Sequence, residues 1–152
     1  MNDPAAAYSR LVPRAIAWAE VRSADILATG RPLNDFGRRL AKSVGVTRAD
    51  LIRVSLARQI PLPDDPELRA FAIEKRLLGP KTFGLTLGYG IYIIDGHASD
   101  RLISHECRHV FQYEAAGSIA TFVPLYLEQI DQCGYEQAPY EIDARLHERD
   151  AP

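Results

Sequence analysis

Two strand-like runs and one helical run follow one another closely in the second half of the sequence. Residues 82–87 and 91–94 are rich in β-branched, aromatic and leucine side chains, and Gly88-Tyr89-Gly90 between them has the flexibility that a tight turn needs. A helical pattern then covers residues 101–116 and stops at Gly117. We therefore predict a β-hairpin that leads directly into a helix, an arrangement that requires an α+β fold.

The remaining elements are expected on both sides of this unit. Apolar spacing, proline at first helical turns and glycine at helix ends indicate several further helices, and a short run of branched residues indicates one more strand. We expect helices over 13–29, 34–45, 66–78 and 119–130, another that opens at Pro139, and a strand over 50–57. We predict a single domain of residues 1–152, with a helical N-terminal part (about 1–46) before the core (about 48–150).

Composition excludes several classes of function. The 152 residues are 47% hydrophobic and 25% charged, which is ordinary for a globular domain. A formal net charge of −2 gives no long-range attraction to nucleic acid or to an anionic membrane, and no apolar run is long enough to cross a bilayer. Cys107 and Cys133 are too few for a disulfide framework, and the first residues lack a secretory pattern, so we expect a soluble cytoplasmic protein.

The segment His105-Glu106-Cys107-Arg108-His109 lies in the middle of the expected helix 101–116. Side chains four residues apart share one face of a helix, so His105 and His109 can bind one metal ion together. Zinc accepts imidazole nitrogen and lowers the pKa of a bound water toward about 7, and the neighbouring carboxylate of Glu106 can accept the proton of that water. The segment therefore predicts a Zn²⁺ site with Glu106 as general base.

A third protein ligand is needed, and acidic residues further along the chain are the candidates. Glu141 is favoured because Pro139 can open a helix whose first turn would face the motif helix. Glu136, in the loop before that helix, remains the alternative. Glu114 lies on the motif helix itself and should point away from the site. Cys107 is about 200° around the helix from each histidine, so we expect it to pack as a small apolar side chain.

The segment resembles the gluzincin branch of zinc metallopeptidases, and most of all the compact bacterial zincin-like domains. The resemblance rests on the His-Glu-x-x-His element, with support from residues 84–93, before the motif, and 138–144, after it. It implies a zincin-like fold, in which a small sheet with a β-hairpin packs on the motif helix and extra helices precede it. It also implies His105, His109 and Glu141 as zinc ligands and Glu106 as general base.

The same resemblance implies a peptide or protein substrate that adds as a strand to the sheet edge, for which we expect the strand 91–94. Larger gluzincins have a His or Tyr that stabilises the oxyanion, but no motif identifies that residue here. Tyr135, Tyr140 and His147 are the candidates, and Gln112 is expected to shape the cleft or to make a core contact.

Three functions remain open on the sequence alone. The first is a zinc-dependent metallopeptidase that uses a zinc-activated water. The second is a zinc-binding, catalytically silent zincin-like interaction domain, and the third is a helical domain without metal. The sequence predicts neither the substrate's identity nor the oligomeric state.

Overall fold

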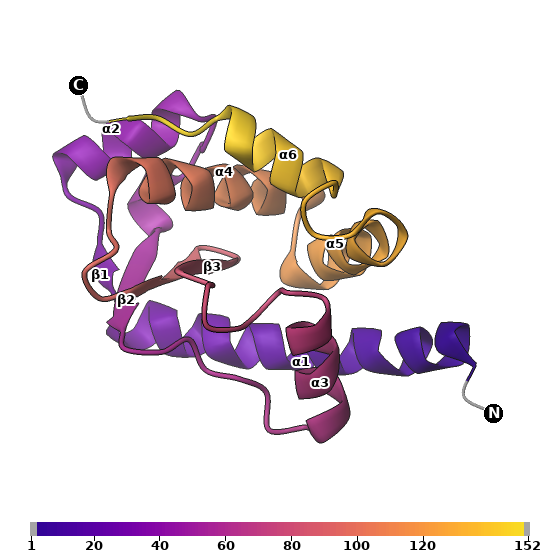
Figure 1. Ribbon diagram of the computed structural model, residues 1–152. Helices are drawn as coiled ribbons and strands as arrows, with labels where there is room; N and C mark the ends of the chain where they lie inside the picture. The colour runs from indigo at the N-terminus through magenta and orange to yellow at the C-terminus, as the bar shows by residue number, and fades with distance from the viewer. Residues whose placement is uncertain (1–2, 151–152) are drawn as a thin grey trace.

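The computed structural model describes residues 3–150 and has an α+β fold with a four-stranded mixed sheet (Figure 1). The termini of the expected domain, residues 1–2 and 151–152, lie outside the described residues. In chain order the elements are α1 (Pro4–Thr29), β1 (Arg31–Pro32), α2 (Asp35–Ser43), a 3₁₀ turn (Ala49–Leu51), β2 (Arg53–Ala57), α3 (Pro66–Glu74), β3 (Gly84–Leu87), β4 (Gly90–Ile94), α4 (Asp100–Ala116), α5 (Ile119–Cys133) and α6 (Pro139–Leu146).

The expected helices and the hairpin are present, with shifted boundaries. The helix expected from Pro13 instead begins at Pro4, where Asp3 caps it, and Pro13 lies inside it. The strand expected over 50–57 is shorter because its first residues form the 3₁₀ turn, and α3 ends four residues before the expected position. β1 lies between the helices expected over 13–29 and 34–45, where no strand was predicted. No helix among residues 3–150 is long and apolar enough to cross a membrane.

The strands pair in the order β1-β2-β4-β3. β4 pairs in parallel with β2 and antiparallel with β3, so it lies inside the sheet and both its backbone edges are used. The prediction that the strand 91–94 forms the substrate edge is therefore wrong. A strand that is apolar on both faces is typical of a sheet interior, and Ile91, Tyr92 and Ile93 are all buried. The edges are β1 and β3.

Helices cover both faces of the sheet, with α4 above it and α1 below it in the view of Figure 1. The alternation of side chains along β4 explains this layering, because Ile91 and Ile93 join the apolar cluster under α2 and α4, whereas Tyr92 joins the cluster against α1. α5 packs on α1 and α4, and α6 packs on α4 and α5. The motif helix is thus held between the sheet and the C-terminal helices.

Candidate metal centre

α4 presents both histidines of the motif on one buried face. The helix begins after Ser99, whose side chain accepts a hydrogen bond from the backbone N–H of Leu102, and it ends at Gly117. His105 and His109 are 9% and 7% exposed, and their ring centroids are 4.9 Å apart. Their spacing of four residues therefore gives the paired arrangement that the sequence predicted.

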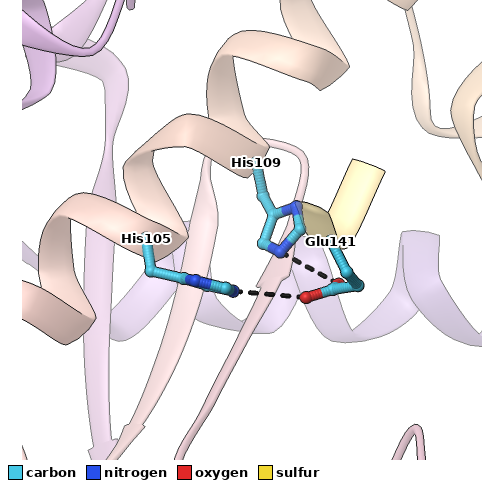
Figure 2. A group of neighbouring side chains, drawn as sticks. All are labelled: His105, His109 and Glu141. Atoms are coloured by element: carbon cyan, nitrogen blue, oxygen red, sulfur yellow. Dashed lines mark ion pairs between the residues drawn. The ribbon is translucent and has the colours of Figure 1, made fainter. Parts of the chain in front are cut away.

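The carboxylate of Glu141 comes from the first turn of α6 and faces both rings (Figure 2). Nε2 of His105 lies 3.3 Å from Oε1 of Glu141, and Nε2 of His109 lies 3.1 Å from Oε2. Pro139 opens α6 and thereby puts Glu141 where the sequence placed it. Ligand atoms of the three residues all lie within 4.8 Å of one another, so this group could hold a metal ion.

The donor set is compatible with a metal ion. Glu141 is only 2% exposed, and its Oε1 has no hydrogen-bond partner among the described residues apart from the 3.3 Å contact with Nε2 of His105. A buried carboxylate oxygen with so few partners is costly, and a cation bound beside it would reduce that cost. Two imidazole nitrogens and one carboxylate oxygen are also ligands that zinc accepts.

The other ring nitrogen of each histidine is anchored. Nδ1 of His109 lies 2.8 Å from Oε1 of Gln112, whose amide nitrogen donates to the carbonyl of Tyr140 and to Oδ2 of Asp143, both at 2.9 Å. Since the Gln112 amide nitrogen has those two acceptors, its oxygen must face His109, so Nδ1 of His109 carries the proton. Nε2 is then free to act as a ligand.

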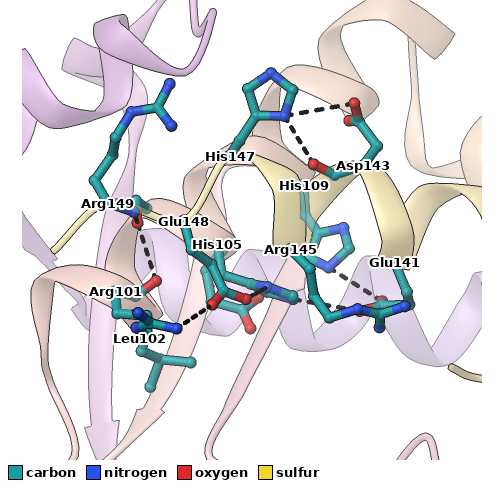
Figure 3. Close-up of polar contacts among 12 residues, drawn as sticks. Arg101, Leu102, His105, His109, Glu141, Asp143, Arg145, His147, Glu148 and Arg149 are labelled. Atoms are coloured by element: carbon teal, nitrogen blue, oxygen red, sulfur yellow. Dashed lines mark hydrogen bonds and ion pairs between the residues drawn. The ribbon is translucent and has the colours of Figure 1, made fainter.

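Glu148 fixes His105 in the same way. The chain after α6 runs back along the start of α4 and brings Oε2 of Glu148 to 2.9 Å from Nδ1 of His105 (Figure 3). Arg101 contacts the other carboxylate oxygen, Oε1, at 3.3 Å, and the backbone N–H of Arg149 donates to Ser104. A carboxylate that accepts from Nδ1 leaves Nε2 directed at the site and makes the imidazole more basic.

Without a metal, the two histidines bind protons more tightly, and Glu141 stays ionised. Burial lowers the pKa of His109, but the charge of Glu141 and its hydrogen bond outweigh that effect and raise the pKa to about 9. The pKa of His105 is also raised, because the hydrogen bond to Glu141 and the charge of Glu106 outweigh burial. Burial raises the pKa of Glu141, but the charge of His109 and hydrogen bonds from His105, His109 and Tyr126 hold it well below its usual range. Metal binding must therefore displace protons from the histidines.

Glu106 points toward the sheet edge beside the same group. Thr86 of β3 donates its hydroxyl to Oε2 of Glu106 at 2.6 Å. At Gly84, a Cβ atom would lie 2.8 Å from Oε1 of Glu106, a distance that real Cβ atoms essentially never show. Glycine therefore allows the edge strand to approach this carboxylate closely.

Two hollows meet at Glu106. The apolar cavity, of about 120 Å³, lies between α1, α3, α5 and β3 and borders Glu106, His109 and Glu141. The open cleft, of about 770 Å³, lies on the other side and borders His105 and Glu106. Leu78, Thr82, Gly84, Glu106 and Tyr135 line both hollows. The apolar cavity thus borders His109 and Glu141, and the open cleft borders His105.

Two tyrosines complete the surroundings of Glu141. Tyr126 donates its hydroxyl to Oε2 of Glu141 at 2.8 Å. Burial, followed by the charge of Glu141, raises the pKa of Tyr126 and of Tyr135 well above the usual range, so both hydroxyls stay protonated at neutral pH.

The other residues considered from the sequence lie outside the group. Glu136 is exposed, and its carbonyl accepts a hydrogen bond from Arg145. Cys107 is fully buried in the apolar cluster beneath α4, as its helical position predicted. Glu114 accepts hydrogen bonds from the backbone N–H groups of Thr47 and Arg48.

Of the three oxyanion candidates, the structure brings only Tyr135 to the hollows. Tyr140 stacks on Phe122 with ring centroids 4.8 Å apart. Nδ1 of His147 lies 2.7 Å from the carbonyl of Asp143. These contacts hold both side chains within the fold, away from the two hollows.

Sequence reasoning missed Tyr126, Thr86 and Glu148. Tyr126 lies in the apolar stretch that indicates the helix over 119–130. A buried tyrosine hydroxyl needs a partner, so this residue could have indicated a polar neighbour. Thr86 and Glu148 carried no comparable signal, because each contacts a motif residue that is distant in sequence.

Comparison with protein-family models, with curated proteins and with solved structures finds no match to this chain. The functional argument therefore depends on the residues of the site.

Proposed function

We propose that the chain is a zinc-dependent metallopeptidase that hydrolyses peptide bonds, with His105, His109 and Glu141 as zinc ligands and Glu106 as general base. One observation carries the proposal: two histidine Nε2 atoms with anchored Nδ1 atoms converge on one buried carboxylate, and Glu106 lines the apolar cavity together with His109 and Glu141. Three protein ligands of this kind, with one position left open, are typical of catalytic zinc.

The bound ion and the side chains of the site would have different roles in peptide-bond hydrolysis. Bound Zn²⁺ supplies a Lewis acid that lowers the pKa of a coordinated water to about 7 and polarises a carbonyl. Glu106 accepts the proton, and the hydroxyl of Thr86 on Oε2 holds the carboxylate so that Oε1 remains to receive it. Tyr135 is our candidate for the donor to the developing oxyanion, because it lines both hollows together with Glu106.

We further propose that the substrate is an extended peptide or unfolded segment that adds to β3. This strand is an edge of the sheet, and Gly84 at its start lines both hollows. Main-chain hydrogen bonds to an edge strand bind peptides with little sequence stringency. The free thiols of Cys107 and Cys133 favour a cytoplasmic location for this activity.

The substitution Glu106→Gln tests the assignment. Metal content should stay at the wild-type level, because Glu106 is not a ligand, whereas peptide hydrolysis should fall about 10²- to 10⁴-fold with the loss of the general base. Elemental analysis and a quenched-fluorescent peptide library measure the two quantities. Glu20→Gln, an exposed change on α1, is the control and should leave both unchanged.

The outcomes separate the candidate functions. Hydrolysis at the wild-type rate in the Glu106→Gln protein would refute the role of Glu106. Stoichiometric zinc with no cleavage of the library by the wild-type chain would favour the catalytically silent interaction domain. Absence of zinc, with no rise in melting temperature when zinc is added, would refute the metal centre itself.

A further inference from the structure

Arg108 lies inside the His-Glu-x-x-His segment, yet the proposed reaction assigns it no part. Its side chain is 16% exposed, and its guanidinium group has partners in three separate places. Nε and Nη2 donate to Oδ2 and Oδ1 of Asp143 at 2.7 and 3.2 Å, and Nη1 donates to the carbonyl of Val44 at 2.8 Å. Cζ lies 3.9 Å from the centroid of the Phe111 ring. The group is therefore fixed in one orientation.

The backbone after α2 is shaped to admit this guanidinium group. Val44 follows the last residue of α2, and Gly45 comes next with a φ of 104°, a left-handed conformation that favours glycine. A Cβ atom at Gly45 would lie 3.0 Å from Nη1 of Arg108 and 3.0 Å from the ring of Phe111. Contacts of this length are tighter than nine in ten real Cβ contacts, so glycine leaves room for the arginine.

Asp143 connects Arg108 to the metal centre in two ways. It lies on α6, two residues after Glu141 (Figure 3), so a carboxylate held by Arg108 also holds the helix that presents Glu141. Its Oδ2 accepts from Nε of Arg108 and from the amide nitrogen of Gln112. That bond helps to turn the amide oxygen of Gln112 toward Nδ1 of His109. Displacement of Asp143 would therefore disturb two of the three ligands.

We infer that Arg108 is a positioning residue of the metal centre and acts through Asp143. It sets the place of α6 against α4 and the orientation of the Gln112 amide, without contact with the ion or the substrate. This inference rests on the proposed zinc site. Arginine is required because its planar fork makes two hydrogen bonds with one carboxylate and a third with the Val44 carbonyl, whereas lysine offers a compact ammonium on a flexible stem.

The sign of the effect on zinc affinity distinguishes positioning from charge. Arg108 is a cation next to His109 in the sequence, so Coulomb repulsion alone predicts that its removal tightens the binding of Zn²⁺. Loss of a group that orients metal ligands has the opposite effect and weakens binding about 10- to 100-fold. Arg108→Met keeps a long side chain but removes the fork, so we expect zinc to bind at least about tenfold more weakly.

Competition with a chromogenic chelator measures this affinity in the folded proteins. Arg48→Met is the matched control, because Arg48 also makes two hydrogen bonds with one carboxylate, that of Asp50, but on the surface. Its zinc affinity should equal that of wild type. Arg108→Lys keeps the charge without the fork, so it should resemble Arg108→Met, and it replaces that variant if circular dichroism shows that the methionine protein does not fold.

Two results would overturn the inference. One is a folded Arg108→Met protein that binds zinc more tightly than Arg48→Met, or within about twofold of it, because a positioning residue must affect affinity by more than that. The other is an Arg108→Lys protein with wild-type affinity, since charge would then suffice.

Cobalt absorption separates positioning from a general loss of stability. The visible spectrum of bound Co²⁺ depends on the number and geometry of its ligands. We expect a changed spectrum in the folded Arg108→Met protein, because Glu141 and His109 are displaced. Ile26→Val, a change on α1 at a residue that is 1% exposed, lowers stability by thinning the core and should keep the wild-type spectrum. A wild-type spectrum in Arg108→Met would show that the arginine only stabilises the fold and would overturn the inference.

Failure of the proposed function gives a different set of results. A wild-type chain that binds zinc but cuts no peptide would refute the peptidase, and weaker zinc binding by Arg108→Met would still support the positioning role. An active peptidase whose Arg108→Met variant keeps its zinc affinity would retain the proposed function and overturn the inference. A wild-type chain that binds neither Zn²⁺ nor Co²⁺ would overturn both.

Discussion

Replacing Gln112 by leucine should weaken zinc binding about 10- to 100-fold, the usual effect of losing a residue that orients a metal ligand. Gln112 is 3% exposed and makes three hydrogen bonds: with Nδ1 of His109 at 2.8 Å, and with the Tyr140 carbonyl and Asp143 at 2.9 Å. Leucine makes none of them. The His109 ring then loses the acceptor that fixes its proton on Nδ1. The proton can move to Nε2, and in that form Nε2 cannot bind the metal.

The loss of affinity corresponds to about 1.4–2.7 kcal/mol of binding free energy. Stability should fall as well. Asp143 keeps its hydrogen bonds from Arg108, and the carbonyl of Tyr140 lies within α6, where the helix satisfies it, but Nδ1 of His109 loses its partner. A buried unsatisfied group costs about 1–3 kcal/mol, so the unfolding free energy of the metal-free chain should drop by about that amount.

A second substitution separates the two effects. Gln112→Glu retains an oxygen for Nδ1 of His109 but replaces the amide nitrogen by an acceptor that faces Asp143 and the Tyr140 carbonyl. We therefore expect wild-type or tighter zinc binding together with lower stability. Gln132→Leu, an exposed change on α5, should alter neither quantity.

Competition with a chromogenic chelator gives the zinc dissociation constants, and urea titration gives the unfolding free energies. The reasoning is refuted if the folded Gln112→Leu protein binds zinc within about threefold of wild type, because a residue that orients His109 must affect the affinity by more than that. It is also refuted if Gln112→Glu binds as weakly as Gln112→Leu.

Two further predictions concern the metal-free chain. The pKa of His109 is raised to about 9, above its unfolded value of about 6.5, so the stability it contributes is fully present below pH 6.5 and is lost as the pH rises through 9. Urea titrations with chelator present should show the unfolding free energy decreasing over this range, and a constant or rising value would contradict the pairing with Glu141. Burial, with a smaller effect from the charge of Glu106, raises the pKa of the Cys107 thiol to about 12, whereas Cys133 is exposed. Ellman's reagent at pH 8 should therefore modify one thiol in the folded protein and a second only in denaturant. Equal reactivity of both thiols in the folded protein would contradict the burial of Cys107.

The sequence predicted those features that depend on local chemistry. Gly117 ends the motif helix, Pro139 opens the helix that carries Glu141, and the glycines around Tyr89 turn the hairpin. Each follows from the backbone preferences of one or two residues. For the same reason, the helical position of Cys107 was sufficient to predict that it faces the core.

The sequence did not predict how strands that are distant in the chain pair in the sheet. Nothing local to residues 91–94 shows that β2, from far earlier in the chain, occupies one side of this strand in parallel. The edge role therefore belongs to β3 and not to β4. Glu148 likewise reaches His105 only because the chain after α6 turns back along α4.

The residues of the proposed metal centre are distributed unevenly along the chain. The motif itself occupies α4, but the proposed third ligand Glu141, the Asp143 that holds Gln112, and the Glu148 that holds His105 all lie between residues 139 and 148. A chain interrupted by a stop codon or a protease before Pro139 would keep the complete His-Glu-x-x-His signature, the sheet and the hairpin. It would lack Glu141, the Glu148 that holds His105, and the Asp143 and Tyr140 groups that hold Gln112. Loss of the residues from Pro139 onward would thus separate the signature from the proposed metal site, so the integrity of segment 139–148 is a better marker of that site than the motif alone.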